Sequence, residues 1–153
     1  MGENAWHWSD AWIFVALVIA NGAGRHRRAA STRRPEGVRL ADMLSTADHL
    51  NHAIPERPAV ETAVRRLVGT GLISVSDGWF RLTPDGERLW RTRPSAGLAT
   101  AVDTVQGVLG RRYTPGDADW TLTEEEHAAA VQEYLVGSIP APRRSPQSRP
   151  GRG

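Results

Sequence analysis

The 153-residue chain contains no cysteine and no lysine. Without cysteine it cannot form disulfides, thiolate nucleophiles or cysteine-ligated zinc sites. The lack of cysteine fits a reducing compartment, and we expect the protein to be cytoplasmic. Because lysine is absent, all 19 basic residues are arginines, yet 17 acidic residues leave a formal net charge of only +2. Net charge alone is therefore weak evidence for a nucleic-acid partner.

Long apolar runs are also missing. The longest covers residues 11–20, about half of the roughly 20 residues that a membrane helix requires, so we expect no membrane insertion. Glu3 and Asp10 precede this run and no arginine does, which is unlike a signal peptide. The sequence has no Ser–His–Asp pattern, glycine-rich phosphate loop or paired-carboxylate motif, so we predict a non-enzymatic protein without a cofactor.

His49 and His52 lie three residues apart on one predicted helix, with Asp48 beside them, and all three are metal-ligating residue types. A zinc site needs further ligands at a defined spacing, and the other histidines are distant, so we interpret the pair as a surface feature at a helix end and predict no metal. Three tryptophans near the N-terminus could stack on bases, cap a ligand pocket or serve as large core and interface anchors, and we favour anchors. They are Trp6, Trp8 and Trp12.

The patterns that are present predict mostly helices. Residues 12–19 are apolar on every side and follow the capping residues Ser9 and Asp10, which favours a buried helix over the alternative of a buried strand. Thr123 begins a capping box that Glu126 completes. Apolar spacing and proline positions predict the other helices. We expect them at about 40–52, 58–68, 84–90 and 98–109, with a last one at 124–136.

One β-hairpin is expected over residues 72–82. Asp77-Gly78 separates two short alternating segments, which is the strongest local hairpin signal and predicts a type I′ turn with positive φ at both residues. The hairpin should share one core with the first and third helices. The predicted core consists of Val60, Val64, Leu67, Leu72, Phe80, Leu82 and several of residues 12–18.

Two motifs resemble the MarR- and PadR-like regulators. Residues 63–73, AVRRLVGTGLI, are similar to the end of a recognition helix leading into the wing, and residues 82–87, LTPDGE, are similar to the segment that follows the wing. The resemblance covers about residues 10–90 and implies a mainly α fold with a small β-hairpin, a winged helix-turn-helix core. It also implies a DNA-binding transcriptional regulator. We expect the helices that follow this core to support a homodimer.

The chain divides into three parts by composition. We expect a winged-helix domain over residues 1–93, which includes an arginine-rich loop at 23–37. C-terminal helices should occupy residues 95–137. Residues 138–153 contain mainly proline, arginine, serine and glycine, cannot bury a core, and are expected to be a disordered basic tail.

The candidate DNA-binding residues form two groups. The loop arginines would act as an electrostatic arm on the phosphate backbone, while the third helix would offer groove and phosphate contacts. A solvated helix face, with Arg65 paired to Glu61, and a loop shaped by codon bias are the alternatives. The two groups are Arg25, Arg27, Arg28, Arg33 and Arg34 in the loop, and Arg57, Thr62, Arg65 and Arg66 at the helix.

A second function of a different class stays open. A winged helix can serve as a protein-interaction module that binds no nucleic acid. The long turn over residues 51–58 and the short hairpin tip favour this alternative. The arginines of the loop and of the third helix favour DNA, and no particular DNA sequence or effector is predicted.

Overall fold

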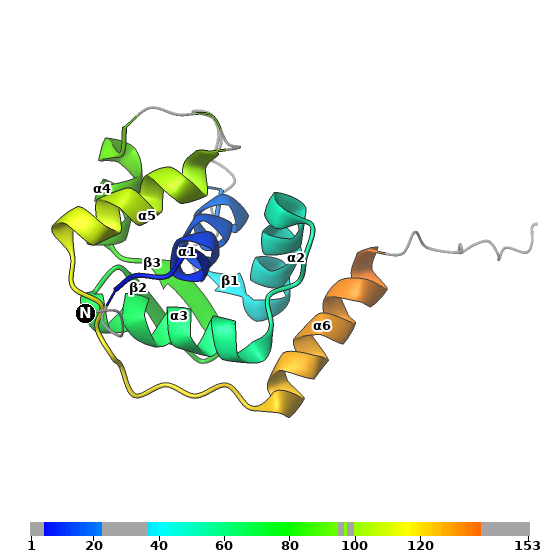
Figure 1. The fold of residues 1–153 in the computed structure, drawn as a ribbon. Helices are drawn as coiled ribbons and strands as arrows, with labels where there is room; N and C mark the ends of the chain where they lie inside the picture. Colours follow the sequence, from blue (N-terminus) through cyan, green and yellow to red (C-terminus); the bar gives the residue numbers. More distant parts are fainter. Residues whose placement is uncertain (1–4, 23–36, 95–96, 98–99, 139–153) are drawn as a thin grey trace, which may run out of the picture.

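The computed structural model describes residues 5–22, 37–94, 97 and 100–138 (Figure 1). Within these ranges the chain forms six helices and one three-stranded antiparallel sheet, which confirms the predicted mainly α fold with a small hairpin. No helix in them is long and apolar enough to cross a membrane. The elements are α1 (Trp8–Ala20), β1 (Val38–Arg39), α2 (Leu40–Asn51), α3 (Arg57–Thr70), β2 (Ile73–Ser76), β3 (Trp79–Leu82), α4 (Pro84–Thr92), α5 (Ala101–Arg112) and α6 (Glu124–Ser138).

Helix α1 is the centre of the fold. Residues 11–18 are all buried, and the helix packs against α2, α3 and α5, so its apolar residues are needed on every side (Figure 1). This confirms a helix rather than a strand here. Of the other predicted core residues, all but Leu82 are buried, and Leu82 is half-buried against the same core.

The hairpin of β2 and β3 is formed as predicted. Asp77 has a φ of 54° and Gly78 a φ of 80°, so both turn residues have the expected positive values. Strand β1 was not predicted. It pairs with β3 through Val38 and Phe80, which gives the strand order β1-β3-β2. A strand of two residues has no alternation to recognise, so only its pairing defines it.

The two C-terminal helices pack on the first half of the chain. Helix α5 lies against α1, and α6 lies along α2 (Figure 1). The Tyr134 hydroxyl donates to Asp48 Oδ2 at 2.6 Å, and this bond to a carboxylate raises the pKa of Tyr134. His127 Nε2 donates to the Pro55 carbonyl at 2.9 Å. These two bonds hold α6 beside α2 and the turn that follows it.

The N-terminal tryptophans anchor this packing, as expected. Trp6 and Trp12 are buried, and their indole nitrogens donate to the carbonyls of Tyr113 and Ala47 at 3.0 and 2.9 Å. Trp8 is 37% exposed and donates to Asp103 Oδ1 at 2.8 Å. Each indole thereby connects the start of the chain to a distant element.

Candidate interaction surface

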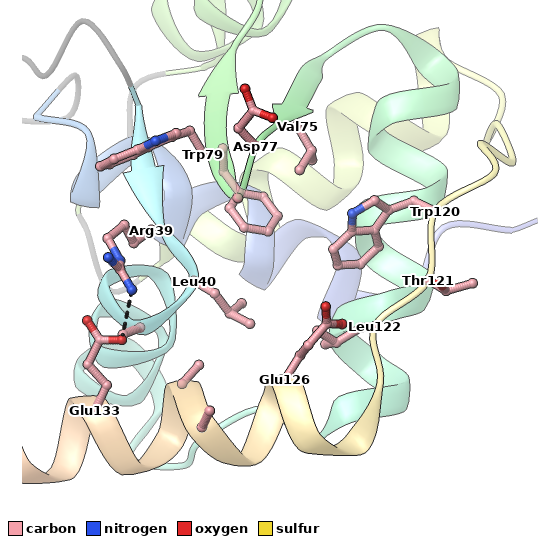
Figure 2. Close-up of a pocket in the computed structure, with 15 residues that line it drawn as sticks. Arg39, Leu40, Val75, Asp77, Trp79, Trp120, Thr121, Leu122, Glu126 and Glu133 are labelled. Atoms are coloured by element: carbon pink, nitrogen blue, oxygen red, sulfur yellow. Dashed lines mark hydrogen bonds and ion pairs between the residues drawn. The ribbon is translucent and has the colours of Figure 1, made fainter.

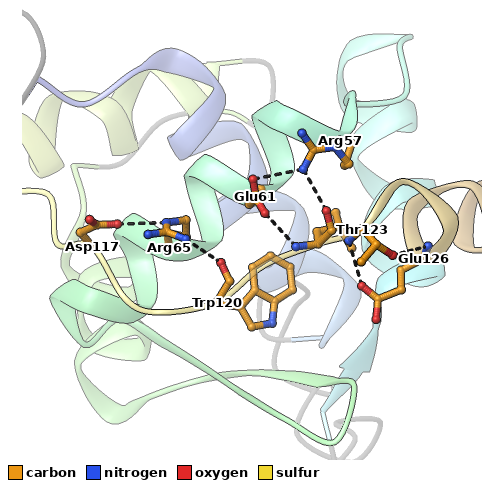
Figure 3. Close-up of polar contacts among 8 residues, drawn as sticks. Arg57, Glu61, Arg65, Asp117, Trp120, Thr123 and Glu126 are labelled. Carbon is orange, nitrogen blue, oxygen red and sulfur yellow. Dashed lines mark hydrogen bonds and ion pairs between the residues drawn. The ribbon is translucent and has the colours of Figure 1, made fainter.

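The outward face of α3 is covered by the chain itself. Residues 113–123, here called the strap, connect α5 to α6 and run along this helix (Figure 3). The face that meets the strap repeats every four residues, at Arg57, Glu61, Arg65 and Gly69. Residues at this spacing lie on one side of a helix. The strap therefore covers two of the four α3 positions at which the sequence predicted DNA contacts, Arg57 and Arg65.

Arg65 is bonded to the strap through its side chain and its backbone. Its Nε donates to Asp117 Oδ1 at 3.0 Å, and its Nη1 donates to the carbonyl of Trp120 at 3.0 Å (Figure 3). The Arg65 carbonyl accepts a bond from the amide of Ala118 at 2.9 Å. The guanidinium is thus directed along the strap and used within the chain.

A second set of bonds lies near the start of α3. Arg57 Nη1 donates to Glu61 Oε1 at 3.1 Å and to the Leu122 carbonyl at 2.9 Å (Figure 3). The amide of Leu122 donates to Glu61 Oε2 at 2.8 Å. This backbone bond, followed by the bond from Arg57, lowers the pKa of Glu61 below its usual 4.5. Glu61 therefore pairs with Arg57, and not with Arg65 as the solvated-face alternative supposed.

At the end of α3 the two backbones approach closely. A Cβ atom on Gly116 would lie 2.3 Å from the carbonyl carbon of Gly69, and one on Gly69 would lie 2.4 Å from the Asp117 amide nitrogen. Thr70 Oγ1 donates to the Thr114 carbonyl at 3.0 Å and accepts from the Gly116 amide at 2.9 Å. Both glycines are needed because no side chain fits between helix and strap.

Arg66 points away from the strap, toward α1. Its Nη1 donates to Asp10 Oδ2 at 2.9 Å and to the Ala5 carbonyl at 2.7 Å. The Arg66 side chain is only 14% exposed and Asp10 is fully buried, so the pair belongs to the interior. Removal of one partner would leave a buried charge without compensation.

The structure describes four of the nine predicted DNA-binding residues. The five loop arginines, Arg25, Arg27, Arg28, Arg33 and Arg34, lie outside the described residues. The three arginines of α3 all bond within the chain, and Thr62 is half-buried. Five exposed acids adjoin the covered face: Asp117, Asp119, Glu124, Glu125 and Glu126. Sequence reasoning missed the strap because it has no periodic pattern; the glycines at 69 and 116 were its only local signal.

A groove lies beside the strap, between the hairpin and α6, with a volume of about 490 Å³ (Figure 2). Figure 2 shows Asp77 and Trp79 on the hairpin side, with Glu126 and Glu133 on α6 opposite. Trp120 of the strap closes one end and packs edge-on against Phe80 at 5.9 Å. The remaining apolar lining is buried or half-buried, except for exposed Ala129: Leu40, Ala41, Val75, Leu122 and Ala130.

The groove has an apolar floor and a charged rim. Arg39 Nη2 bonds to Glu133 Oε1 at 3.1 Å, and both side chains are about half exposed, so the pair stands at the rim. Asp77 is exposed at the tip of the hairpin. Concave surfaces with apolar lining and few polar groups are typical binding sites. No family model, curated protein or solved structure matches the chain.

Proposed function

We propose that the protein is a winged-helix interaction module that binds an extended segment of a protein partner in the groove between the hairpin, the strap and α6. The order helix, helix, helix, hairpin, helix in residues 8–92 supports the winged-helix assignment. The observation that carries the functional proposal is the strap, which covers the outward face of α3.

A winged helix that reads DNA inserts its recognition helix into the major groove, where side chains must reach base edges. Two of the α3 candidates for this role, Arg57 and Arg65, already donate to the strap, and a third, Arg66, pairs with buried Asp10. DNA would have to displace a segment held by three contact regions. The exposed acids of the strap and of the first turn of α6 would repel phosphates as well.

The groove offers what a peptide ligand requires. It is open along one side, its floor is apolar, and aromatic rings line it, all of which are typical of surfaces that anchor extended segments. The adjoining strand β1 pairs with β3 alone among the described strands, so it forms one edge of the sheet. Side chains of a partner would insert between Val75, Trp120 and Leu40.

Two parallel titrations test this proposal. The full-length protein is titrated with random duplex DNA at about 50 and about 200 mM salt, where phosphate binding would weaken by orders of magnitude. It is also screened against a displayed library of random peptides. We expect selected peptides and no salt-dependent DNA binding. Trp79→Ala should abolish peptide capture, whereas Trp8→Ala, which removes an exposed tryptophan outside the groove, should retain it.

DNA binding remains the second candidate. The loop at 23–37 places five arginines against a single acid, Glu36, and this composition favours a phosphate-binding arm. Leu135 and Val136 expose 43% and 58% of their surfaces at the end of α6, which favours the predicted homodimer. Strong DNA binding that falls steeply with salt and weakens in Arg65→Ala would overturn the interaction module.

A further inference from the structure

The rim of the groove selects for positive charge. Three carboxylates and one guanidinium line it: Asp77, Glu126 and Glu133 against Arg39. Since Arg39 and Glu133 pair with each other, two carboxylates remain for a ligand. Glu126 uses Oε1 to accept from the Thr123 amide, and Asp77 has no partner in the part of the chain that the structure describes. A ligand with arginine or lysine side chains would complete this rim.

The tryptophans of the groove differ from those of the N-terminus. Trp6, Trp8 and Trp12 all donate their indole N–H to an acceptor in the chain. Trp79 and Trp120 donate to no acceptor among the described residues, although both are half-buried. Neither indole nitrogen is among the buried side-chain atoms that lack a partner, so both are open to solvent. Both N–H groups can therefore donate to the carbonyl groups of a ligand.

Proline-rich segments combine these properties. Proline has no N–H, so the chain around it adopts an extended helix whose carbonyls are free and whose rings pack on aromatic side chains. Grooves lined by aromatic residues recognise such segments. Arginines within the segment would meet the two carboxylates and stack on indole rings. The groove thus fits an extended ligand rich in proline and arginine.

The chain itself contains such a segment directly after α6. Residues 139–153 include four prolines, four arginines and no acid. Helix α6 ends at Ser138, five residues after Glu133 of the rim, which corresponds to about 7.5 Å along a helix. A proline-type extended chain of this length spans roughly 46 Å, enough to run back along the groove. The other arginine-rich segment, residues 23–36, fits the groove less well, because it is tethered at both ends and contains only one proline, Pro35.

We propose that residues 139–153 bind in the groove of their own chain and compete there with the partner segment. This inference rests on the proposed function, since it assigns the groove a ligand class and a means of regulation. Tethering gives the segment a millimolar effective concentration, so a partner segment must outcompete it in order to bind in the groove. Loss of the segment's positive charge would weaken its binding and leave the groove available to the partner.

The indole N–H signals of the six tryptophans, recorded by NMR on the full chain, test occupancy directly. We expect those of Trp79 and Trp120 to shift when the four arginines of the segment become glutamine, while those of Trp6 and Trp12 stay in place. A control removes four arginines from the loop instead and should shift neither groove signal. Unchanged groove signals in the first variant, or equal shifts in the control, would overturn the inference. The tail variant is Arg143→Gln, Arg144→Gln, Arg149→Gln and Arg152→Gln; the control is Arg25→Gln, Arg27→Gln, Arg28→Gln and Arg33→Gln.

A synthetic peptide of residues 139–153 provides the second measurement. Added to the full-length tail variant, it should return both groove signals to their wild-type positions and bind roughly tenfold more tightly than to the wild-type chain. Asp77→Asn and Glu126→Gln should each weaken it several-fold, and Glu125→Gln, one residue outside the groove lining, should not.

The outcomes separate the two proposals. Library peptides that bind in the groove, with no effect of the tail variant, would overturn the inference and leave the proposed function in place. If neither the library peptides nor the tail peptide shift the indole signals of Trp79 and Trp120, both the proposed function and the inference are overturned. Equal peptide affinity for the wild-type chain and the tail variant would likewise overturn intramolecular occupancy.

Discussion

Helix α3 is covered on both faces, by different means. Its inner face is an apolar stripe of Val60, Val64 and Leu67, each fully buried in the common core with α1. Its outer face is polar and is covered by the strap, a segment without regular structure, through directed hydrogen bonds and ion pairs. Apolar burial is non-directional and strong, whereas each polar contact stabilises only modestly and requires a matching partner.

The largest effect is expected on the inner face. Leu67→Ala removes a fully buried side chain and should lower the free energy of unfolding by about 2–5 kcal/mol. Val68→Ala, at the half-buried neighbouring position, is the control and should cost less. Urea denaturation of both variants measures the difference. Equal stabilities for the two would contradict the assignment of an inner and an outer face.

The close approach between helix and strap should give the next largest effect. In Gly116→Ala the new methyl group would collide with the Gly69 backbone, and overpacking of this kind costs roughly 1–3 kcal/mol. Gly110→Ala in α5 has nothing within 4 Å of its Cβ and should instead stabilise the protein by about 0.5–1 kcal/mol. Thermal melts compare the two. A Gly116→Ala variant as stable as wild type would mean that the strap does not touch α3.

Arg65→Ala tests the central polar contact. The loss of its bonds to the strap should cost about 1 kcal/mol, mainly from the bond to the Trp120 carbonyl, since Asp117 is 78% exposed and well solvated. Hydrogen exchange at the Ala118 amide should also become faster. Arg88→Ala, which breaks an exposed pair with Asp85, is the control and should cost less. The opposite order of stabilities would contradict a specific role for Arg65.

The smallest effect concerns pH. The pKa of Glu61 is lowered in the folded protein, so its contribution to stability is present above its usual value of 4.5 and is lost as pH falls through the lowered pKa. Glu61→Gln keeps an acceptor for the Leu122 amide but does not titrate. Stability measured at about pH 7 and about pH 3 should therefore fall less in this variant than in wild type. An equal fall in both would mean that Glu61 is not coupled to folding.

Local patterns predicted the elements well where one residue type decides the geometry. Asp77-Gly78 defined the hairpin because few residue pairs adopt positive φ, and Thr123 with Glu126 formed the predicted capping box with bonds of 3.0 Å in both directions. Strand β1 escaped prediction because it exists only through its pairing with β3. The candidate site was harder for the same reason. The arginines of α3 look alike in sequence, and the partners that distinguish them lie about 50 or more residues away.

The sequence by itself determined the helices, the hairpin and the apolar stripe that buries α3, because periodicity and turn chemistry act over a few neighbouring residues. Only the tertiary structure decided what covers the opposite face. Arg65 has an acid within helical reach at Glu61, yet its ion pair is with Asp117, because the strap brings that carboxylate closer in space. The groove likewise joins three stretches of the sequence: β1 with the start of α2, the hairpin, and the strap with α6. Nothing local couples these three stretches, so a surface made from all of them follows from packing alone.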